Sequence, residues 1–341
     1  MEKIKLTDIC NPKQWKTIPT SELLENGYPV YGANGIIGYY SEFNHKNPVI
    51  TVTCRGATCG TINITVPKSY VTGNAMCLDD MRSDIYMEYL YYCLKHYNFN
   101  NVISGSAQPQ ITRQGMEKIY VTIGSHNEQM DIVDKLKKVE NVIGLRKREL
   151  KQLDTLVKSR FAEMFGDPIR NPKGWKVVTI GDIVTEVRYG TSKPAVEGGK
   201  YPYLRMNNLT ADGHLDLNDL KYIDISDDEV EKCVVRKGDV LFNRTNSIDL
   251  VGKTAVFDLQ DDMVIAGYII RVRLNEKILP EVLSQYMNLE ALKDILRSMA
   301  KGAVNQANIN AQELQSIRVY VPGIELQKQF VEMKDQVDKS K

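Results

Sequence analysis

The most regular hydrophobic pattern in the chain is a heptad repeat that runs from about residue 128 to residue 165. Leu136, Ile143, Leu150, Val157 and Met164 follow one another at intervals of seven, in a segment without proline and with a single glycine. Apolar residues at this spacing line one side of a helix, so the pattern predicts a long helix that packs lengthwise against another helix. At about 1.5 Å per residue, this helix is roughly 57–60 Å long.

A second, shorter helix of the same character is expected from about Glu325 to Lys341, with Phe330 and Val337 among its apolar positions. A single exposed heptad helix is poorly stabilised in water, so we expect the two helices to pair antiparallel as a coiled coil. Because the second helix is shorter, either the chain is truncated there or another chain covers the remaining seam. The residues expected in the coiled coil or in docking a partner are Leu136, Ile143, Leu150, Val157, Met164, Phe330 and Val337.

The chain also repeats itself. Residues 108–139 and 306–337 share eight identities over 32 positions at a constant offset of 198, where chance gives about two. Weaker echoes precede them in the same order: Tyr28–Tyr31 resembles Tyr201–Leu204, and Val49–Val52 followed by Arg55 resembles Val240–Phe242 followed by Arg244. The chain is therefore predicted to hold two copies of one globular unit, each followed by the start of a helix.

Short apolar runs separated by turn signals predict that each copy is α+β. Strands and helices do not alternate as repeated βαβ units, which disfavours a doubly wound parallel sheet. The expected boundaries are 1–125 for the first unit, 126–166 for the long helix, 167–323 for the second unit and 324–341 for the C-terminal helix. The expected strands are Val49–Thr53, Thr61–Val66, Lys118–Ile123, Val240–Asn243, Thr254–Phe257, Val264–Leu274 and Ser316–Val321.

Composition narrows the class of protein. The 341 residues are 43% hydrophobic and 26% charged, with a net charge of +1, which suits about two folded domains and excludes wholesale disorder. No window approaches 18 uncharged apolar residues, and the first residues lack the apolar core of a signal peptide, so a membrane span and secretion are not expected. The six cysteines show no disulfide spacing, which indicates a reduced, cytoplasmic protein.

No catalytic set stands out. Cys54 and Cys59 are five residues apart without a nearby pair of histidines, and the four histidines are scattered, so neither zinc nor any other metal is expected. Gly252-Lys253-Thr254 lacks the upstream glycine of a phosphate-binding loop and is interpreted as a tight turn. No glycine-rich nucleotide loop or nuclease-type carboxylate cluster is present, so we expect neither a cofactor nor catalysis by this chain.

Several motifs resemble one family in their order and duplication. They are Gly302 to Ile309, Ile317–Pro322 and Glu325-Leu326-Gln327, echoed over Gln108–Gln129, and Phe165–Pro168 followed by Asn171–Trp175. Over essentially the whole chain, they resemble the DNA-specificity (S) subunit of type I restriction–modification systems.

This resemblance implies two similar α+β target recognition domains in a pseudo-twofold repeat, each reading one half of a bipartite site in double-stranded DNA. The paired helices would set the gap between half-sites and dock two methyltransferase (modification) subunits, with a translocase/nuclease restriction subunit as a further partner. The subunit itself would not be catalytic. Two alternatives stay open: a self-contained enzyme that modifies or cleaves DNA, and a coiled-coil adaptor that does not bind DNA.

Loops rich in Arg, Asn, Gln, Ser and Thr are the expected base-reading and phosphate-binding segments, because these side chains pair with purine edges and phosphates. The alternative is ordinary turn chemistry, in which such side chains bond their own backbone. The basic run along the long helix likewise has two interpretations, a solvated face or a surface near spacer phosphates or a partner subunit. The candidate DNA contacts are Arg55, Ser106, Gln110, Arg113, Arg188, Tyr189, Lys193, Arg205, Asn207, Asn243, Arg244, Asn246, Lys301 and Asn305.

Overall fold

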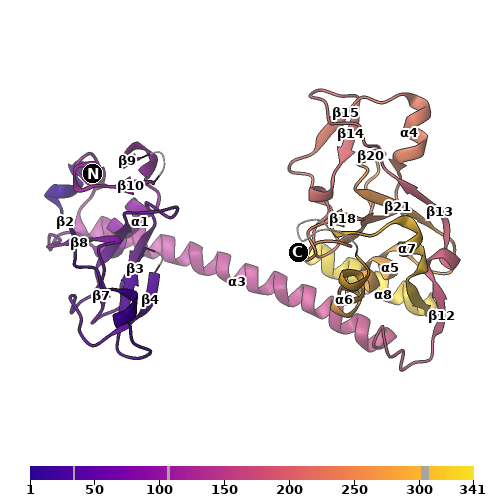
Figure 1. The fold of residues 1–341 in the computed structure, drawn as a ribbon, viewed down its shortest axis with the longest axis horizontal. Helices are drawn as coiled ribbons and strands as arrows, with labels where there is room; N and C mark the ends of the chain where they lie inside the picture. Colours follow the sequence, from indigo (N-terminus) through magenta and orange to yellow (C-terminus); the bar gives the residue numbers. More distant parts are fainter. Residues whose placement is uncertain (34, 106–107, 301–306) are drawn as a thin grey trace. The chain divides into compact units, whose positions relative to one another are not determined.

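The computed structural model describes residues 1–33, 35–105, 108–300 and 307–341, which form two compact units, Met1–Leu145 and Arg146–Lys341. The elements of both units are drawn in Figure 1. The predicted long helix is present as α3 (His126–Phe165), 40 residues long, and the division between the units falls within it. In the described ranges, no helix is long and apolar enough to span a membrane.

The first unit is built from small, mostly antiparallel sheets. Their strand orders are β2-β8-β5-β6, β4-β3-β7, β1-β11 and β10-β9, and β3 runs parallel to β7. The helices are α1 (Met87–Lys95) and α2 (Arg113–Met116). The strands are β1 (Glu2–Lys5), β2 (Asn11–Gln14), β3 (Tyr28–Gly32), β4 (Gly35–Tyr40), β5 (Ile50–Thr53), β6 (Ile62–Ile64), β7 (Tyr70–Val71), β8 (Ala75–Asp79), β9 (Ile103–Ser104), β10 (Gln110–Ile111) and β11 (Tyr120–Ile123).

The core of the first unit lies on both faces of the β2-β8-β5-β6 sheet. All four residues of β5 are buried, the threonines Thr51 and Thr53 as well as Ile50 and Val52, because both faces of this strand are covered. Val52 on one face joins a cluster with Leu90 of α1 and Val133 of α3. Cys77 joins a smaller cluster that includes Tyr31. The first turns of α3 are therefore held by the core of the first unit.

The second unit repeats this plan with insertions. Its sheets have the orders β13-β21-β17-β19, β15-β14-β20-β16, β12-β23 and β18-β22. The helices are α4 (Asp227–Cys233), α5 (Pro280–Met287), α6 (Glu290–Met299), α7 (Ala311–Ser316) and α8 (Ile324–Ser340). The strands are β12 (Lys176–Thr179), β13 (Val184–Tyr189), β14 (Tyr201–Leu204), β15 (Lys221–Ile223), β16 (Val234–Val235), β17 (Val240–Asn243), β18 (Thr245–Asn246), β19 (Thr254–Val256), β20 (Met263–Ile265), β21 (Ile269–Leu274), β22 (Ala307–Asn308) and β23 (Arg318–Val321).

The repeat predicted from the sequence is confirmed element by element. Strand β11 and strand β23 are 198 residues apart, each pairs with the first strand of its unit, and each leads into a helix. The parallel pair β3 and β7 of the first unit corresponds to β14 and β20 of the second. One expected strand, Val264–Leu274, is divided. The chain changes sheets at Ala266-Gly267-Tyr268, so β20 and β21 pair with different neighbours.

A buried glutamine performs the same task in both copies. Gln129 accepts a hydrogen bond from the Tyr86 N–H at 2.8 Å and donates to the Asp84 and Gly124 carbonyls, both at 3.0 Å. Gln327 accepts from the Leu279 N–H at 2.8 Å and donates to the carbonyls of Lys277 and Pro322 at 3.0 and 2.8 Å. Each glutamine ties the first turn of α3 or α8 to the chain entering α1 or α5. This identity in the repeat therefore belongs to the scaffold.

The antiparallel pairing of α3 and α8 is confirmed within the second unit. Phe330 of α8 packs its ring against Phe161 and Phe165 of α3, with ring centroids 5.3 and 5.5 Å apart. Further along α8, the Lys341 Nζ is 2.7 Å from Asp154, and Arg146 Nη2 donates to the Lys341 carbonyl at 2.7 Å. As α8 advances, its contacts move back along α3, as antiparallel helices require.

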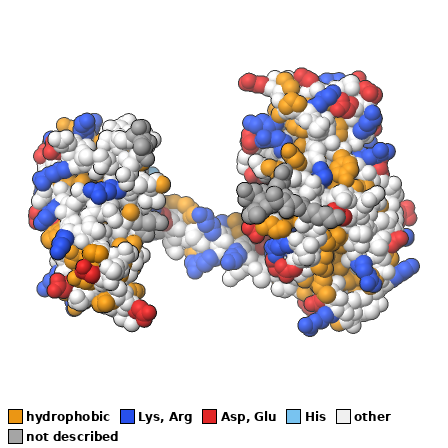
Figure 2. All heavy atoms as spheres, viewed as in Figure 1, with side chains coloured by type: hydrophobic (Ala, Val, Ile, Leu, Met, Phe, Trp, Pro, Cys, Tyr) orange, Lys and Arg blue, Asp and Glu red, His pale blue; other side chains and the backbone are white. Residues whose placement is uncertain are grey.

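The seam differs from the heptad prediction in which side chains it uses. Val157 and Val337 are buried there, whereas Ile143 is 48% exposed. Phe161 was not among the predicted seam residues, yet it is fully buried, because aromatic rings fill the junction between α3, α8 and Tyr286 of α5. Leu136 packs against the core of the first unit. Figure 2 shows exposed hydrophobic side chains among basic ones on α3.

Candidate nucleic-acid interface

A cleft in the second unit gathers several of the predicted DNA contacts. Its volume is about 540 Å³, and Lys193, Arg205, Asn207 and Arg244 all contribute to its wall although they come from distant parts of the sequence. The lining consists of Thr191, Ser192, Lys193, Pro194, Ala195, Tyr203, Arg205, Met206, Asn207, Arg244, Ala266, Gly267 and Tyr268.

Arg244 is held over an aromatic ring. It follows β17 directly, and its guanidinium lies 5.0 Å from the centroid of the Tyr189 ring. The Tyr189 hydroxyl accepts a hydrogen bond from the Ala311 N–H at 2.8 Å, which fixes the ring. Arg244 makes one long bond, from Nη1 to the Gly267 carbonyl at 3.5 Å. A stacked guanidinium keeps its donors in one plane, which suits the two acceptors of a guanine edge or a phosphate.

The loop that carries Arg205 and Asn207 is held in place by hydrogen bonds from Asn208 and Lys253. Asn208 accepts from the Arg205 N–H at 2.8 Å and donates to the Asp216 carbonyl at 2.8 Å. Lys253 donates to the Met206 carbonyl at 2.9 Å, and burial lowers the pKa of Lys253. Lys253, in the predicted turn Gly252-Lys253-Thr254, therefore holds this loop through a hydrogen bond to its backbone. Asn207 is exposed at the tip of the loop.

Ion pairs engage the other charged candidates. Arg205 Nη2 is 2.7 Å from Asp219, and Lys193 Nζ is 2.6 Å from Glu229, which lowers the pKa of Glu229 through that hydrogen bond. Arg188 pairs with Glu186 of its own strand at 3.0 Å and does not line the cleft. Such solvent-accessible pairs contribute little to stability.

Two predicted contacts in this region, Asn243 and Asn246, form hydrogen bonds within the scaffold. Asn243 is fully buried and donates to the Thr245 and Tyr268 carbonyls at 3.3 Å. Asn246 donates to the Asn243 side-chain oxygen at 3.0 Å. Both amides therefore fix the chain leaving β17. Asn243 has no exposed surface with which to reach a base, whereas Asn246 is partly exposed and stays a predicted contact. The predicted contacts Ser106, Lys301 and Asn305 lie outside the described residues.

In the first unit, the remaining candidates lie near one another. Arg55 and Gln110 face each other across an isolated antiparallel bridge, and both side chains are exposed. Arg113 opens α2 three residues later, and its Nη2 donates to the side-chain oxygen of Asn11 at 3.1 Å. Arg55 and Gln110 thus come together from separate segments, and Arg113 follows close to Gln110 along the chain.

The Arg55 cluster of the first unit and the Arg244 cluster of the second occupy corresponding places in the repeat. The structural alignment of the two copies differs by one residue from the sequence alignment, which paired Arg55 with Arg244. The Ile111 N–H bonds the Cys54 carbonyl at 3.0 Å, and the Ile309 N–H bonds the Arg244 carbonyl at 2.9 Å. Arg244 therefore corresponds to Cys54, and Arg55 corresponds to the next residue of the second unit, Thr245. Each unit presents an arginine at this bend, one residue apart.

Buried polar atoms without a partner concentrate at the same place. Of the six such side-chain atoms among the described residues, four belong to Arg205, Arg244, Thr245 and Asn308. A buried donor or acceptor that neither protein, water nor ligand satisfies costs about 1–3 kcal/mol, so these four atoms have hydrogen-bonding capacity left for water or a ligand. Asn308 was not predicted, because only the β18–β22 pairing brings it next to Thr245.

Comparison with known proteins identifies the family. The model of the type I restriction modification DNA specificity domain matches residues 1–155 and 172–341. The type I restriction enzyme EcoKI specificity subunit of Escherichia coli K12 is 24% identical over 74% of this chain and 59% of its own length. The putative MjaX specificity subunit of Methanocaldococcus jannaschii is 30% identical over 49% of this chain and 40% of its own. The chain thus spans less than two thirds of these relatives.

Solved structures agree on the fold. The S subunit of a type I restriction–modification system from M. genitalium superposes with a TM-score of 0.58 at 15% identity, over 99% of this chain and 89% of that one. Because the same domain model matches both repeats and together these matches cover most of the sequence, the chain belongs to the type I restriction–modification DNA specificity family.

Proposed function

We propose that the chain is the DNA-binding specificity subunit of a type I restriction–modification complex and that each unit reads one half of a bipartite DNA site. The observation that carries this proposal is the duplication of the candidate surface. Arg55 with Gln110 in one copy and Arg244 in the other occupy corresponding bends. Two copies of one reader with different side chains suit an asymmetric site with two different half-sites.

Helix α3 supports a role in spacing the half-sites. Its 40 residues measure about 60 Å at about 1.5 Å per residue, which corresponds to at most about 17 base pairs at about 3.4 Å each. This length accommodates half-sites about one helical turn of DNA apart, with an unread spacer between them. Residues 1–125 and 167–323 act as the two recognition domains in this scheme.

The middle of α3 supports docking of the methyltransferase subunits. Val139, Val142, Ile143 and Leu145 are 55%, 63%, 48% and 50% exposed, an unusual density of apolar surface on one helix. A translocase/nuclease subunit is a further partner in this proposal, and the chemistry resides in the partners rather than in this chain.

The basic residues of α3 have two roles in this proposal. Lys135 pairs with Asp131 and Arg146 with Glu149, both at 2.6 Å, as expected of a solvated helix face. Lys151 is exposed and lies in the same basic run, where spacer phosphates or a partner subunit would meet it.

Footprinting with reconstituted methyltransferase subunits tests the proposal. The full chain should protect two half-sites separated by an unprotected spacer, and exchanging residues 1–125 for those of another family member should change one half-site only. Protection of one uninterrupted site, or none, contradicts the proposal.

Two further measurements separate the alternatives. Affinity for DNA should fall steeply with salt, since phosphate contacts release counterions, whereas a coiled-coil adaptor shows no such dependence. The pure chain with DNA, magnesium and a methyl donor should give no product. Turnover without partners would identify a self-contained enzyme instead.

A further inference from the structure

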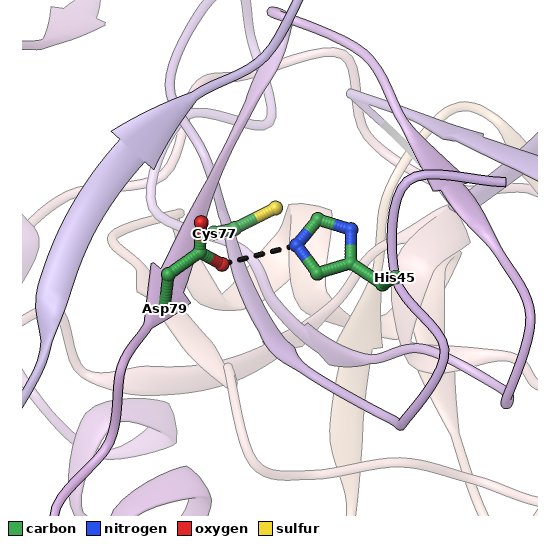
Figure 3. Close-up of side chains that lie close together, drawn as sticks. All are labelled: His45, Cys77 and Asp79. Carbon is green, nitrogen blue, oxygen red and sulfur yellow. Dashed lines mark hydrogen bonds and ion pairs between the residues drawn. The ribbon is translucent and has the colours of Figure 1, made fainter.

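Three side chains in the first unit meet in a way that the sequence did not suggest. Cys77 and Asp79 are two residues apart on β8, so both point to one face of the strand. His45 comes from the loop before β5, where its backbone pairs with Ser69 through two bonds of 3.0 Å. The ligand atoms of the three side chains lie within 4.8 Å of one another, and Figure 3 shows the imidazole directed at the Asp79 carboxylate.

The hydrogen bonds around His45 determine which ring nitrogen carries a proton. Asn44 accepts from the Val71 N–H at 2.8 Å and donates to the Val71 carbonyl at 3.0 Å, so its amide has one possible orientation. Its oxygen is 2.7 Å from His45 Nδ1, and Nδ1 must therefore be the donor. In the neutral imidazole this leaves Nε2 with a lone pair.

That lone pair is directed at another acceptor. His45 Nε2 lies 3.0 Å from Asp79 Oδ1, while Asp79 Oδ2 already accepts from Trp15 Nε1 at 3.0 Å. Two acceptors at this distance repel each other unless a positive charge lies between them. Either a second proton on the imidazole or a metal ion supplies that charge. The thiol of Cys77 adds a third donor of the kind that zinc takes, although its burial raises the pKa of this thiol.

In the second unit, arginine side chains occupy the positions that correspond to Cys77 and Asp79. Strand β21 corresponds to β8, and its residues Arg271 and Arg273 hold the positions of Cys77 and Asp79. Arg271 is fully buried and lies 2.6 Å from Glu186, and Arg273 is 2.9 Å from Asp239. The first unit has ligand-type side chains where the second has two guanidinium groups.

Two of the three side chains lie at a surface hollow, whereas Cys77 is fully buried. His45 and Asp79 line a hollow of about 440 Å³ together with Lys13 and Lys46. Lys13 lies over the Trp15 ring at 3.9 Å, and among the described residues neither lysine forms an ion pair with Asp79. The carboxylate is therefore not paired with a lysine, and the hollow gives solvent access to His45 and Asp79.

We propose that His45 Nε2, Cys77 Sγ and the Asp79 carboxylate form a zinc site in the first unit, with water as the fourth ligand. Nitrogen, thiolate sulfur and carboxylate oxygen are the ligands that zinc takes, and a tetrahedral ion spaces them about 3.3–3.8 Å apart, within reach of the observed arrangement. Binding releases the thiol proton of Cys77 to solvent. Asn44 holds the imidazole as the supporting partner that zinc-bound histidines have. The ion would fasten the His45 loop to β8.

Metal substitution in the full chain tests this site. The protein is stripped with a chelator, desalted and titrated with Co²⁺ alone under anaerobic conditions, and zinc uptake is measured separately by elemental analysis after gel filtration. We expect one ion per chain, the visible absorption of a tetrahedral cobalt site and a near-ultraviolet thiolate-to-cobalt band. Cys77→Ala should lose that band, and the matched control Cys93→Ala, a cysteine of α1, should keep it.

His45→Gln provides a second variant should Cys77→Ala fail to fold, and its zinc content should fall about tenfold or more. Substoichiometric zinc in the wild-type chain, or a cobalt spectrum without the thiolate band, overturns the proposal. In that outcome a proton on His45 pairs with Asp79. A band that survives Cys77→Ala in folded protein also overturns it.

Discussion

Replacing the buried glutamine of the second unit should destabilise that unit alone. Gln327→Met keeps the length of the side chain and removes its amide, which bonds the Leu279 N–H and the carbonyls of Lys277 and Pro322. Gln327 is fully buried, so no water replaces the lost amide without a rearrangement of the helix start.

The size of the effect follows from the groups left behind. The Lys277 carbonyl belongs to an exposed residue, whereas Leu279 is half-buried and Pro322 is buried. Two desolvated backbone groups at about 1–3 kcal/mol each, less a small gain from the apolar methionine, lower the free energy of unfolding by about 2–5 kcal/mol. Gln329→Met, an exposed position two residues further on α8, should change it by less than about 0.5 kcal/mol.

The chain offers a reporter for each unit. Of its two tryptophans, Trp15 lies in the first unit, and Trp175 lies in the second, where it donates to the Phe165 carbonyl at 2.8 Å. In a Trp15→Phe background, urea unfolding followed by fluorescence reports the second unit. In a Trp175→Phe background, which leaves Trp15 as the reporter, the corresponding substitution Gln129→Met should shift the unfolding of the first unit by a similar amount. A loss below about 1 kcal/mol for Gln327→Met, or equal shifts of both reporters by either variant, would refute the reasoning.

Three further predictions concern the second unit. Hydrogen bonds to Asp212 and Asp338 raise the pKa of His214 from 6.5 to about 9. The charged imidazole therefore contributes its full stabilisation of the fold below pH 6.5, and this contribution is lost as the pH rises through about 9. The urea midpoint should fall over that range more in the wild type than in His214→Gln, and parallel curves would contradict this. Phe161→Ala should cost about 3–5 kcal/mol on the tryptophan reporter of this unit, and a cost below about 1 kcal/mol would mean that α8 is held elsewhere. Arg244→Ala should weaken specific DNA binding by about 1–3 kcal/mol in competition assays, whereas Arg188→Ala, outside the cleft, should matter less, and the reverse order would move the interface.

The repeating architecture follows from patterns that are local in the chain. Heptad spacing sets the face of a helix, and apolar runs between turn signals set strands, because both depend on residues that are neighbours along the chain. The helix over residues 126–165 and the strand over residues 240–243 were predictable for this reason. The 198-residue offset likewise located β11 and β23 without any coordinates.

Tertiary structure decided which side chains meet. Phe161 enters the core because α8 and α5 leave room there for an aromatic ring, which a seven-residue period does not encode. The division of the run 264–274 depends on its two halves pairing in different sheets. The stacking of Arg244 on Tyr189 and the meeting of His45 with Asp79 join residues far apart in the chain. Such contacts depend on how sheets and loops pack, and local patterns carry no record of that packing.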